Sequence, residues 1–479
     1  MEKRRTILSN VNIIVGPPGT GKTTTLLNLL DEYLGKGIRP KDVGYISFTV
    51  KAADEAKSRA TERFGFRKDE LPWFRTLHSL AFRWLRLDTK MIMKRNHYSQ
   101  ICEKLGIEYS GFMVMDEGVM LPGGYAGDRM LFQEGLARVR MLSLEEQYNR
   151  STEDFSFSEL SRLKSTLEAY KDSYSLMDFN DMLTLMLAEK NLPRFKVLFI
   201  DEAQDLSRLQ WAVVHKLIAN SEQVYIAGDD DQAIFAWAGA DPDSFISMPG
   251  NVTTLAKSYR LPKAVHRLSE AVIRGISNRR PKAFSSRDEE GLVSFVSDIS
   301  DIDMSQGDWL VLARNKYLLN PAEQLCEMEG FAYDSKDSPM RTDQAAAIRA
   351  YENLRAGKDI TDDDRALIKK YGAKVDGTGP IWHEAFTRIG QDVKDYFIAC
   401  LRRKESITKT PRIKLSTIHG AKGGEATNVV IYSDMSYKSF EEMTNDPDNE
   451  LRVFYVAATR AKQNLFIIEP RTLNSFNWV

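Results

Sequence analysis

The stretch that most constrains the fold of this chain is GPPGTGKT at residues 16–23. A short apolar run precedes it, and a leucine-rich segment with helical spacing follows it. A strand, a glycine-rich turn and a helix that opens with Lys-Thr form the pattern G-x-x-x-x-G-K-[ST], which surrounds phosphate oxygens with backbone N–H groups. Because proline has no N–H group, we expect the phosphate-binding amides to lie in residues 19–23. The stretch therefore predicts that the chain binds a nucleoside triphosphate.

Each residue type in this stretch has an expected task. Glycine lets the backbone approach a ligand closely, and the helix N-terminus adds partial positive charge. The Lys22 ammonium is expected to contact the β- and γ-phosphates, and the Thr23 hydroxyl is expected to bind Mg²⁺. The expected nucleotide-binding residues are Gly16, Gly19, Thr20, Gly21, Lys22, Thr23 and Thr24.

Strands and helices alternate along much of the sequence, which predicts an α/β fold with parallel, doubly wound sheets. The apolar runs at residues 196–200 and 309–313 are typical of strands that are buried on both faces. Two mostly helical stretches interrupt the alternation, so we expect two sheet domains with one insertion each. The first domain is expected to comprise residues 1–86 and 176–255 around an insertion at 87–175, and the second to comprise 256–336 and 410–479 around a smaller insertion at 337–409.

The composition limits the classes of partner and compartment. Lys and Arg number 66 against 67 Asp and Glu, so the formal charge of -1 neither requires nor excludes a nucleic-acid partner. Three widely spaced cysteines without a C-x-x-C pair favour a reducing compartment and argue against a zinc or iron–sulfur site. No apolar run approaches the length of a membrane span, and the charged N-terminus does not resemble a signal peptide. We therefore expect a cytoplasmic protein without a membrane partner.

Asp201 and Glu202 directly follow the apolar run at residues 196–200. Ligand sites of parallel sheets form at the carboxyl ends of the strands. Alone, an Asp-Glu pair in this place is more often the start of a helix, but the upstream phosphate-binding stretch favours a catalytic role. Asp201 is then expected to hold Mg²⁺, directly or through water, and Glu202 to orient and deprotonate the water that attacks the γ-phosphate.

An ordered series of short stretches resembles the motifs of superfamily 1 helicases of the UvrD/Rep/PcrA type. The series runs through both expected sheet domains in the family's order, which makes the resemblance specific although each stretch after the first is weak alone. The stretches are GPPGTGKTT (16–24), ISFTVKAADEAKSRA (46–60), FRTLHS (74–79), FIDEAQD (199–205), AGDDDQAIFAWAGA (227–240), KSYR (257–260), STIHGAKGGE (416–425) and FYVAATRAK (454–462).

This resemblance implies two RecA-like motor domains that close around ATP and Mg²⁺ and move along single-stranded DNA. The implied enzyme is an ATP-dependent DNA helicase, an ATP hydrolase that nucleic acid stimulates, with 3′→5′ movement. Its implied substrates are single-stranded DNA and junctions of single strand and duplex, with replication or repair proteins as unidentified partners. RNA as the track stays open, because no residue recognisably reads a 2′-hydroxyl. The compact chain suggests a minimal or phage-encoded member, in the cytosol of a bacterium or of a phage-infected host.

The resemblance also assigns roles to single residues around the nucleotide. Gln232 matches the glutamine that senses the γ-phosphate beside the attacking water. Arg260 and Arg460 match two arginine fingers that the second domain contributes to catalysis. Glu425 matches a carboxylate that binds the ribose, and Tyr259 matches an aromatic residue that stacks on adenine.

Further residues are implied to contact the DNA strand. Phe235 and Trp237 are two positions apart, so an extended backbone would point both rings to one side, where they could stack on bases. A pair of core aromatic residues is the alternative reading of this spacing. The other implied strand contacts are Phe48, Thr76 and His78 in the first domain and Arg314, Asn315, Thr417 and His419 in the second.

Several questions stay open at the level of sequence. The family's glutamine-bearing stretch before the phosphate loop has no counterpart, since residues 1–15 contain no glutamine, and selectivity for ATP over other nucleotides is therefore undecided. One alternative function is a single-strand translocase that strips proteins without unwinding duplexes. Another is a nucleotide-gated DNA-binding or loading factor with little turnover.

Overall fold

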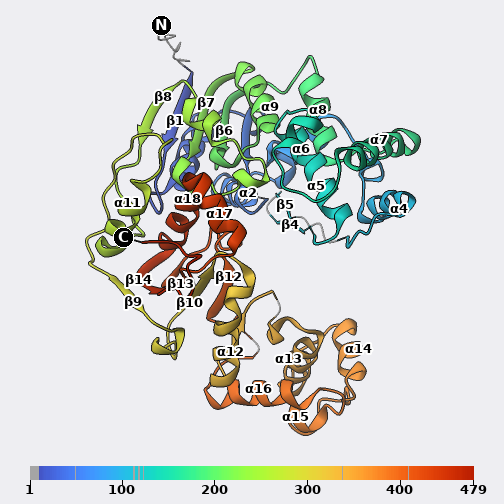
Figure 1. Cartoon of the computed structure of the whole chain (residues 1–479), viewed down its shortest axis with the longest axis vertical. Coiled ribbons are helices and arrows are strands. Elements are labelled where there is room, and N and C mark those ends of the chain that lie inside the picture. Colours follow the sequence, from blue (N-terminus) through green and yellow to red (C-terminus); the bar gives the residue numbers. More distant parts are fainter. Residues whose placement is uncertain are drawn as a thin grey trace. The chain divides into compact units, whose positions relative to one another are not determined.

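The computed structural model describes residues 10–48, 50–111, 114–116, 119–121, 123–336, 338–407 and 409–478, and the chain divides into two compact units (Figure 1). Unit 1 comprises Met1–Tyr259 and Ser277–Ser285, and unit 2 comprises Arg260–Ile276 and Ser286–Val479. Within the described parts of the chain, no helix is long and apolar enough to cross a membrane.

Unit 1 is built on a six-stranded sheet in the order β3-β2-β6-β7-β1-β8, in which every pair of neighbours is parallel. Along β6 the buried side chains alternate between the two faces: Val197 and Phe199 pack on one side, and Leu198 and Ile200 on the other. The strands are β1 (Val11–Val15), β2 (Val43–Ser47), β3 (Phe74–Thr76), β6 (Phe195–Asp201), β7 (Ser221–Gly228) and β8 (Asn251–Thr254).

Helices cover both faces of this sheet. Apolar side chains of α1 and α2 share one core with Val197 and Phe199, and those of α3, α8 and α9 share another with Leu198 and Ile200. The helices are α1 (Lys22–Gly35), α2 (Val50–Phe64), α3 (Leu77–Trp84), α8 (Phe179–Ala188), α9 (Arg208–Ala219) and the short α10 (Pro242–Ser247).

The first insertion is mostly helical, as expected, and lies beside the first sheet in unit 1 (Figure 1). Leu160, Leu163 and Leu167 follow helical spacing on α7 and pack with Ile101 of α4 in a separate core. A short antiparallel hairpin, β4–β5, is an element that the sequence does not predict. The elements are α4 (Arg95–Leu105), β4 (Val114–Asp116), β5 (Val119–Leu121), α5 (Ala126–Val139), α6 (Leu144–Asn149) and α7 (Phe157–Tyr174).

Unit 2 repeats the parallel architecture with a six-stranded sheet in the order β11-β12-β10-β13-β14-β9. Its central strand β10 is buried along its whole length, in agreement with the apolar run at residues 309–313. Its strands are β9 (Leu292–Val296), β10 (Trp309–Ala313), β11 (Tyr333–Asp334), β12 (Ile413–Thr417), β13 (Ala426–Tyr432) and β14 (Ala461–Ile468). The flanking helices are α11 (Lys263–Ile273), α12 (Asn320–Glu329), α17 (Tyr437–Asn445) and α18 (Pro447–Ala458).

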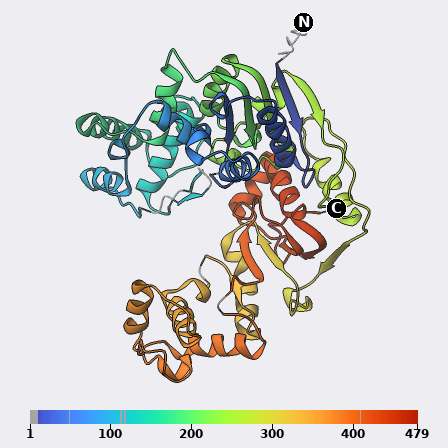
Figure 2. The same ribbon diagram turned by 180° about the vertical axis from the view of Figure 1, so that it is seen from behind.

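The second insertion is a small helical group that follows α12 within unit 2 (Figure 2). Trp382, Phe386 and Phe397 form its centre, and their cluster continues into Val311 and Leu415 of the sheet. The group therefore shares a core with its own sheet. Its helices are α13 (Asp343–Arg355), α14 (Asp362–Lys370), α15 (Trp382–Ala385) and α16 (Gln391–Arg402).

These two parallel sheets with flanking helices confirm the expected α/β class. The division of the chain differs from the expected boundary at residues 255–256, since residues 256–259 and 277–285 belong to unit 1. The backbone N–H of Tyr259 donates to the carbonyl of Gly19, and Lys282 is paired with carboxylates of unit 1, which explains both differences. The bounds of the two insertions stay predictions.

Candidate active site

The glycine-rich turn lies between the carboxyl end of β1 and the start of α1, as the sequence predicts. Gly19 and Gly21 have φ angles of 71° and 82°, in the left-handed region where glycine carries no steric penalty. A Cβ atom placed on Gly16 would lie 1.9 Å from Cγ of Lys22, so only glycine leaves room for that side chain. The Thr20 hydroxyl donates to the Pro17 carbonyl at 2.8 Å and braces the turn.

Lys22 and Thr23 place their functional atoms at the edge of the sheet. The Lys22 ammonium donates to the Gly16 carbonyl at 2.7 Å, which folds the side chain back over the loop. The Thr23 hydroxyl donates to Oδ2 of Asp201 at 2.9 Å, and Asp201 ends β6. Thr24, one position further along α1, is exposed. The structure thus joins the loop to the first predicted carboxylate.

Asp201 is buried, and its environment changes its acidity. Burial and the charge of Glu202 raise the pKa of Asp201 to about 6, against the hydrogen bond from Thr23 and the charge of Lys22. No group of three His, Cys, Asp or Glu side chains in the described residues forms a complete metal site. Mg²⁺ commonly takes one or two carboxylates and completes its shell with phosphates and water. A hydroxyl and a carboxylate at this edge fit such a cation together with a nucleotide.

Glu202 has an unusual backbone conformation for its residue type. Its φ of 54° is left-handed, which costs free energy for a residue other than glycine and is seen most often at functional sites. One oxygen of its carboxylate accepts from Nε2 of Gln204 at 2.5 Å. The adjacent Asp201 carboxylate accepts from Thr23 instead, so the two neighbouring carboxylates have different partners.

Gln232 follows β7, the neighbour of β6 in the sheet. Its Nε2 donates to Oδ2 of Asp229 at 2.6 Å, and the backbone N–H of Asp229 donates to Oε1 of Gln204 at 3.0 Å. Gln204 therefore links Glu202 to Asp229, and Asp229 links onward to Gln232. The sequence analysis did not single out Gln204, although it lies inside the FIDEAQD stretch. Its link to Asp229 depends on the neighbouring strand β7 and leaves no signal in the stretch itself.

Residues 258 and 259 bring the KSYR stretch onto the phosphate loop. The Ser258 hydroxyl donates to the Pro18 carbonyl at 2.7 Å, and the backbone N–H of Tyr259 donates to the Gly19 carbonyl at 2.8 Å. The Tyr259 side chain is 73% exposed beside this loop. Its ring is thus accessible to a base, as the predicted stacking role requires.

In unit 2 the structure brings Arg260, Arg460 and Glu425 together. Arg260 forms an ion pair with Glu425 at 2.6 Å, and Lys462 pairs with the other oxygen of Glu425 at 2.8 Å. Burial raises the pKa of Glu425, but the hydrogen bond from Lys462 and the charge of Arg260 bring it below its usual value. Nε of the buried Arg460 donates to the Val456 carbonyl at 2.9 Å, in the last turn of α18.

Three of the predicted strand contacts of unit 1 line a cavity of about 420 Å³ between the first insertion and the sheet. Phe48, His78 and Phe235 line it, and the rings of Phe48 and Phe235 stack with centroids 6.0 Å apart. Burial lowers the pKa of His78 to about 4, so its imidazole is neutral near pH 7. Thr76 caps the N-terminus of α3, where its hydroxyl accepts from the N–H of Ser79.

One expectation about the aromatic pair is wrong. Residues 236–238 form a turn of 3-10 helix rather than an extended segment, and Phe235 has φ of -103° and ψ of 21°. Phe235 is buried against Phe48, whereas the half-buried Trp237 lies 6.2 Å from the ring of Phe132 on α5. The backbone at these residues therefore lacks the extended form from which we expected both rings to point to one side, and stacking of either ring on a base stays a prediction.

The predicted strand contacts of unit 2 all lie near carboxyl ends of its strands. Arg314 makes a bidentate ion pair with the buried Glu450, with both distances 2.7 Å. Asn315 accepts from the N–H of Ser436, and Thr417 accepts from the N–H of Gly420. His419 is half-buried two positions after the end of β12. The hydrogen bonds give Arg314, Asn315 and Thr417 structural tasks, and contact with DNA stays a prediction for all four residues.

The chain matches two protein-family models. Residues 2–253 match the UvrD/REP helicase N-terminal domain, and residues 394–472 match the UvrD-like helicase C-terminal domain. The chain is similar to the ATP-dependent DNA helicase PcrA of Bacillus subtilis (strain 168), with 26% identity over 298 residues, and to that of Staphylococcus aureus (strain Mu50), with 25% identity over 299 residues. Each match covers 58% of this chain and 40% of the relative, so the chain matches less than half of the relatives' length. A solved structure described as "The structure of PRRSV helicase" covers 98% of this chain and 55% of its own at 13% identity, with a TM-score of 0.35 that is too low to bear on the fold.

Proposed function

Since this chain belongs to the UvrD/REP helicase family, we propose that it is an ATP-dependent, Mg²⁺-requiring DNA helicase that moves along single-stranded DNA. The observation that carries the proposal is the chain of contacts at one edge of the first sheet. Thr23 contacts Asp201, and Glu202 connects through Gln204 and Asp229 to Gln232. The residues that we propose as phosphate loop, cation-binding carboxylate, base and sensor therefore all belong to one unit.

ATP hydrolysis at this edge would use the residues as follows. Lys22 and the amides of the loop bind the phosphates, while Glu202 orients a water molecule and accepts its proton as the water oxygen attacks the γ-phosphorus. Gln232 contacts the γ-phosphate and the attacking water, and ADP leaves with the electrons of the broken P–O bond. When bound, Mg²⁺ would neutralise charge on the phosphate oxygens, with Thr23 and Asp201 as its protein ligands.

Catalysis by this chain would depend on both units. Arg260 and Arg460 belong to unit 2 and are the arginines that we propose to stabilise charge on the γ-phosphate. Tyr259 would stack on adenine and Glu425 would bind the ribose.

The DNA strand is proposed to contact the carboxyl ends of both sheets. Phe48, Phe235 and Trp237 offer aromatic surfaces for bases, and stacking is worth about 1–3 kcal/mol per base in any sequence. If each unit binds the strand differently with and without nucleotide, the ATP cycle becomes stepping, for which we propose the 3′→5′ direction. We propose a cytoplasmic protein that acts at single-strand/duplex junctions with replication or repair partners.

The decisive experiment is ATP hydrolysis with and without single-stranded DNA for the wild type and Glu202→Gln. We expect the strand to stimulate the wild type and the variant to lose turnover while it still binds ATP. An unchanged rate in Glu202→Gln, or no stimulation of the wild type, would contradict the proposal.

Unwinding and translocation need separate measurements. A forked duplex tests strand separation, and single strands labelled at either end test movement and its direction. Movement without unwinding would identify a translocase that strips proteins, and binding without turnover would identify a loading factor. Matched RNA strands in the same assays would show which nucleic acid is the track.

A further inference from the structure

The segment Ser277–Ser285 belongs to unit 1, although the chain on both sides of it belongs to unit 2. It is held by specific contacts with the region that follows β7. Asn278 donates to Oδ1 of Asp243 at 2.6 Å, and the guanidinium of Arg280 donates to the Phe245 carbonyl at 2.7 Å. None of the eight stretches that carry the resemblance includes this segment, and the proposed function gives it no role.

Lys282 is the most deeply buried charge of the segment. Its side chain is 1% exposed, and its ammonium lies 2.8 Å from Asp229, 2.6 Å from Asp230 and 3.0 Å from Asp231. Burial alone would lower the pKa of Lys282, but the three fully buried carboxylates raise it well above its usual value. This ammonium is thus in contact with three adjacent carboxylates in the interior of the unit, of which Asp231 also pairs with Arg279.

Asp229 connects this ammonium to Gln232. Oδ1 of Asp229 accepts from Lys282 at 2.8 Å, and Oδ2 of the same carboxylate accepts from Nε2 of Gln232 at 2.6 Å. Burial raises the pKa of Asp229, but the charges of Lys282 and Lys22 lower it further than burial raises it. Asp229 is therefore ionised and acts only as an acceptor, so the Gln232 amide must turn its NH₂ group toward Asp229 and its oxygen away.

We propose that Lys282 is a positioning residue for ATP hydrolysis, which fixes the Asp229 carboxylate and through it the orientation of the Gln232 amide. The inference rests on the proposed function of Gln232 as the sensor of the γ-phosphate. Without the ammonium, Asp229 would lie beside two more carboxylates with less compensation, and it would take up a proton or turn. A protonated Asp229 can donate to the Gln232 amide, which would reverse that amide.

The test compares Lys282→Met with Arg279→Gln. Arg279 lies in the same segment and makes a bidentate ion pair with Asp231, at 2.9 and 2.6 Å, so its loss removes a charge from the same cluster without removing the donor to Asp229. We expect Lys282→Met to lower kcat of strand-stimulated ATP hydrolysis by about 10- to 100-fold, the effect of misplacing a catalytic group by about 1 Å. Binding of a fluorescent ATP analogue and of single-stranded DNA should change little, and Lys282→Arg should recover part of kcat.

A structural role would have a different signature. It would lower the thermal midpoint together with kcat, nucleotide binding and strand binding. Should Lys282→Met fail to fold, the double variant Lys282→Met/Asp230→Asn removes one negative charge along with the positive one and keeps Asp229. A folded variant with the kcat of the wild type, or with a loss no larger than that of Arg279→Gln, would overturn the inference. Failure of both variants to fold would overturn it too, because it would assign Lys282 to the stability of the unit.

The wild type and the Glu202→Gln variant test the proposed function separately from Lys282. A wild type without strand-stimulated hydrolysis, or a fully active Glu202→Gln, would refute the function itself. A stimulated wild type, an inactive Glu202→Gln and an active Lys282→Met would refute only the inference about Lys282.

Discussion

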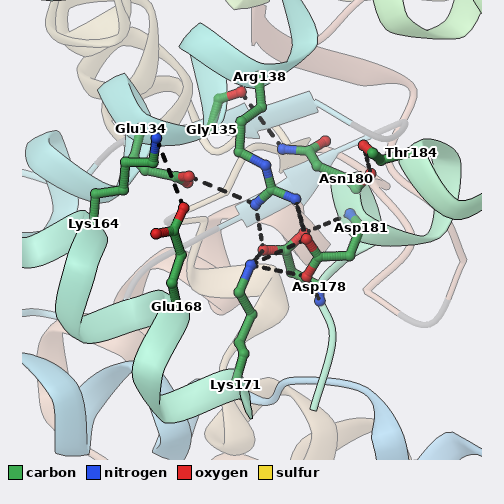
Figure 3. A network of polar contacts seen from close by, with 10 residues as sticks. All are labelled: Glu134, Gly135, Arg138, Lys164, Glu168, Lys171, Asp178, Asn180, Asp181 and Thr184. Atoms are coloured by element: carbon green, nitrogen blue, oxygen red, sulfur yellow. Dashed lines mark hydrogen bonds and ion pairs between the residues drawn. The ribbon is translucent and has the colours of Figure 1, made fainter. Parts of the chain in front are cut away.

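Glu134 shows how burial sets the acidity of a single carboxyl group. It lies on α5 beside the cavity, is 4% exposed and is 3.7 Å from the guanidinium of Arg138 (Figure 3). Burial raises the pKa of Glu134 to about 7, because desolvation outweighs the attraction of Arg138. Near neutral pH the group therefore changes between a neutral and a charged state while it remains inside the protein.

The raised pKa predicts a pH-dependent gain of stability in Glu134→Gln. Between pH 4.5 and about 7 the unfolded chain loses the Glu134 proton while the folded protein keeps it. The free energy of unfolding of the wild type therefore falls as pH rises through this range and stays at the lower value above it. The variant should match the wild type near pH 4.5 and exceed it above pH 7 by up to about 3 kcal/mol, since one pKa unit corresponds to about 1.4 kcal/mol. Urea unfolding at a series of pH values measures the difference. His78, whose pKa falls to about 4, contributes equally to both proteins and cancels. A variant less stable than the wild type at high pH would contradict this assignment.

At the level of residues, the sequence predicts those roles that depend on neighbours in the chain. Lys22 and Thr23 are recognisable because the glycines that shape the loop surround them. Lys282 is not recognisable, because its three partners lie about fifty positions away and a lone lysine is usually a solvated surface residue. Pairings of this kind are set by tertiary packing, which leaves no local pattern.

At the level of elements, burial decides what the sequence reveals. The central strands β6 and β10 are apolar along their length, and their bounds agree with the predicted runs. The edge strands β8 and β9 have mostly exposed or half-exposed residues; β8 has no apolar run, and β9 is short, with a serine between its apolar residues. The sequence also does not predict the 3-10 turn at residues 236–238, because two aromatic residues at this spacing are compatible with an extended segment and with a 3-10 turn alike.

Three helices of unit 1 meet in one polar network. Asp178 precedes α8 and caps its N-terminus by accepting from the N–H of Asp181, while its carboxylate accepts two hydrogen bonds from Arg138 of α5 and one from Lys171 of α7 (Figure 3). Burial raises the pKa of Asp178, but Arg138 and Lys171 bring it down to about 2. The network therefore joins the first insertion to α8, whose apolar side packs in the core of the sheet.

This arrangement predicts that Asp178→Ala destabilises the insertion and α8 together. Removing one partner of a buried ion pair costs about 3–5 kcal/mol, because the remaining charges stay buried. Hydrogen exchange should accelerate in α5, α7 and α8 at once, and urea unfolding should give the loss of free energy. Glu168→Gln is the matched control, since it breaks the exposed pair of Lys164 and Glu168 on α7 and should cost less than about 0.5 kcal/mol. Exchange that accelerates in α8 alone would show that Asp178 acts as a helix cap rather than as the link between elements.

At the level of the whole molecule, the two units meet along the chain within the KSYR stretch. Tyr259 is bound to the phosphate loop through its backbone N–H, and the next residue, Arg260, is paired with Glu425 in unit 2. A residue that would stack on the base and a residue that would stabilise the γ-phosphate are therefore joined by one peptide bond. The KSYR stretch therefore joins a residue held by the phosphate loop of unit 1 to a residue held by a carboxylate of unit 2.

The final prediction concerns Arg260→Ala and tests whether catalysis uses both units. The phosphate loop would be intact in this variant, so affinity for ATP should change little. Arginine fingers contribute about 10³–10⁵ in kcat in related enzymes, and we expect a loss in that range for strand-stimulated hydrolysis. Arg267→Ala is the control, because Arg267 lies exposed on α11 in the same unit and pairs with the exposed Glu290. A loss of ATP binding in Arg260→Ala with unchanged kcat would show that this arginine binds the nucleotide without stabilising the transition state. Equal rates in both variants would remove Arg260 from the chemical step.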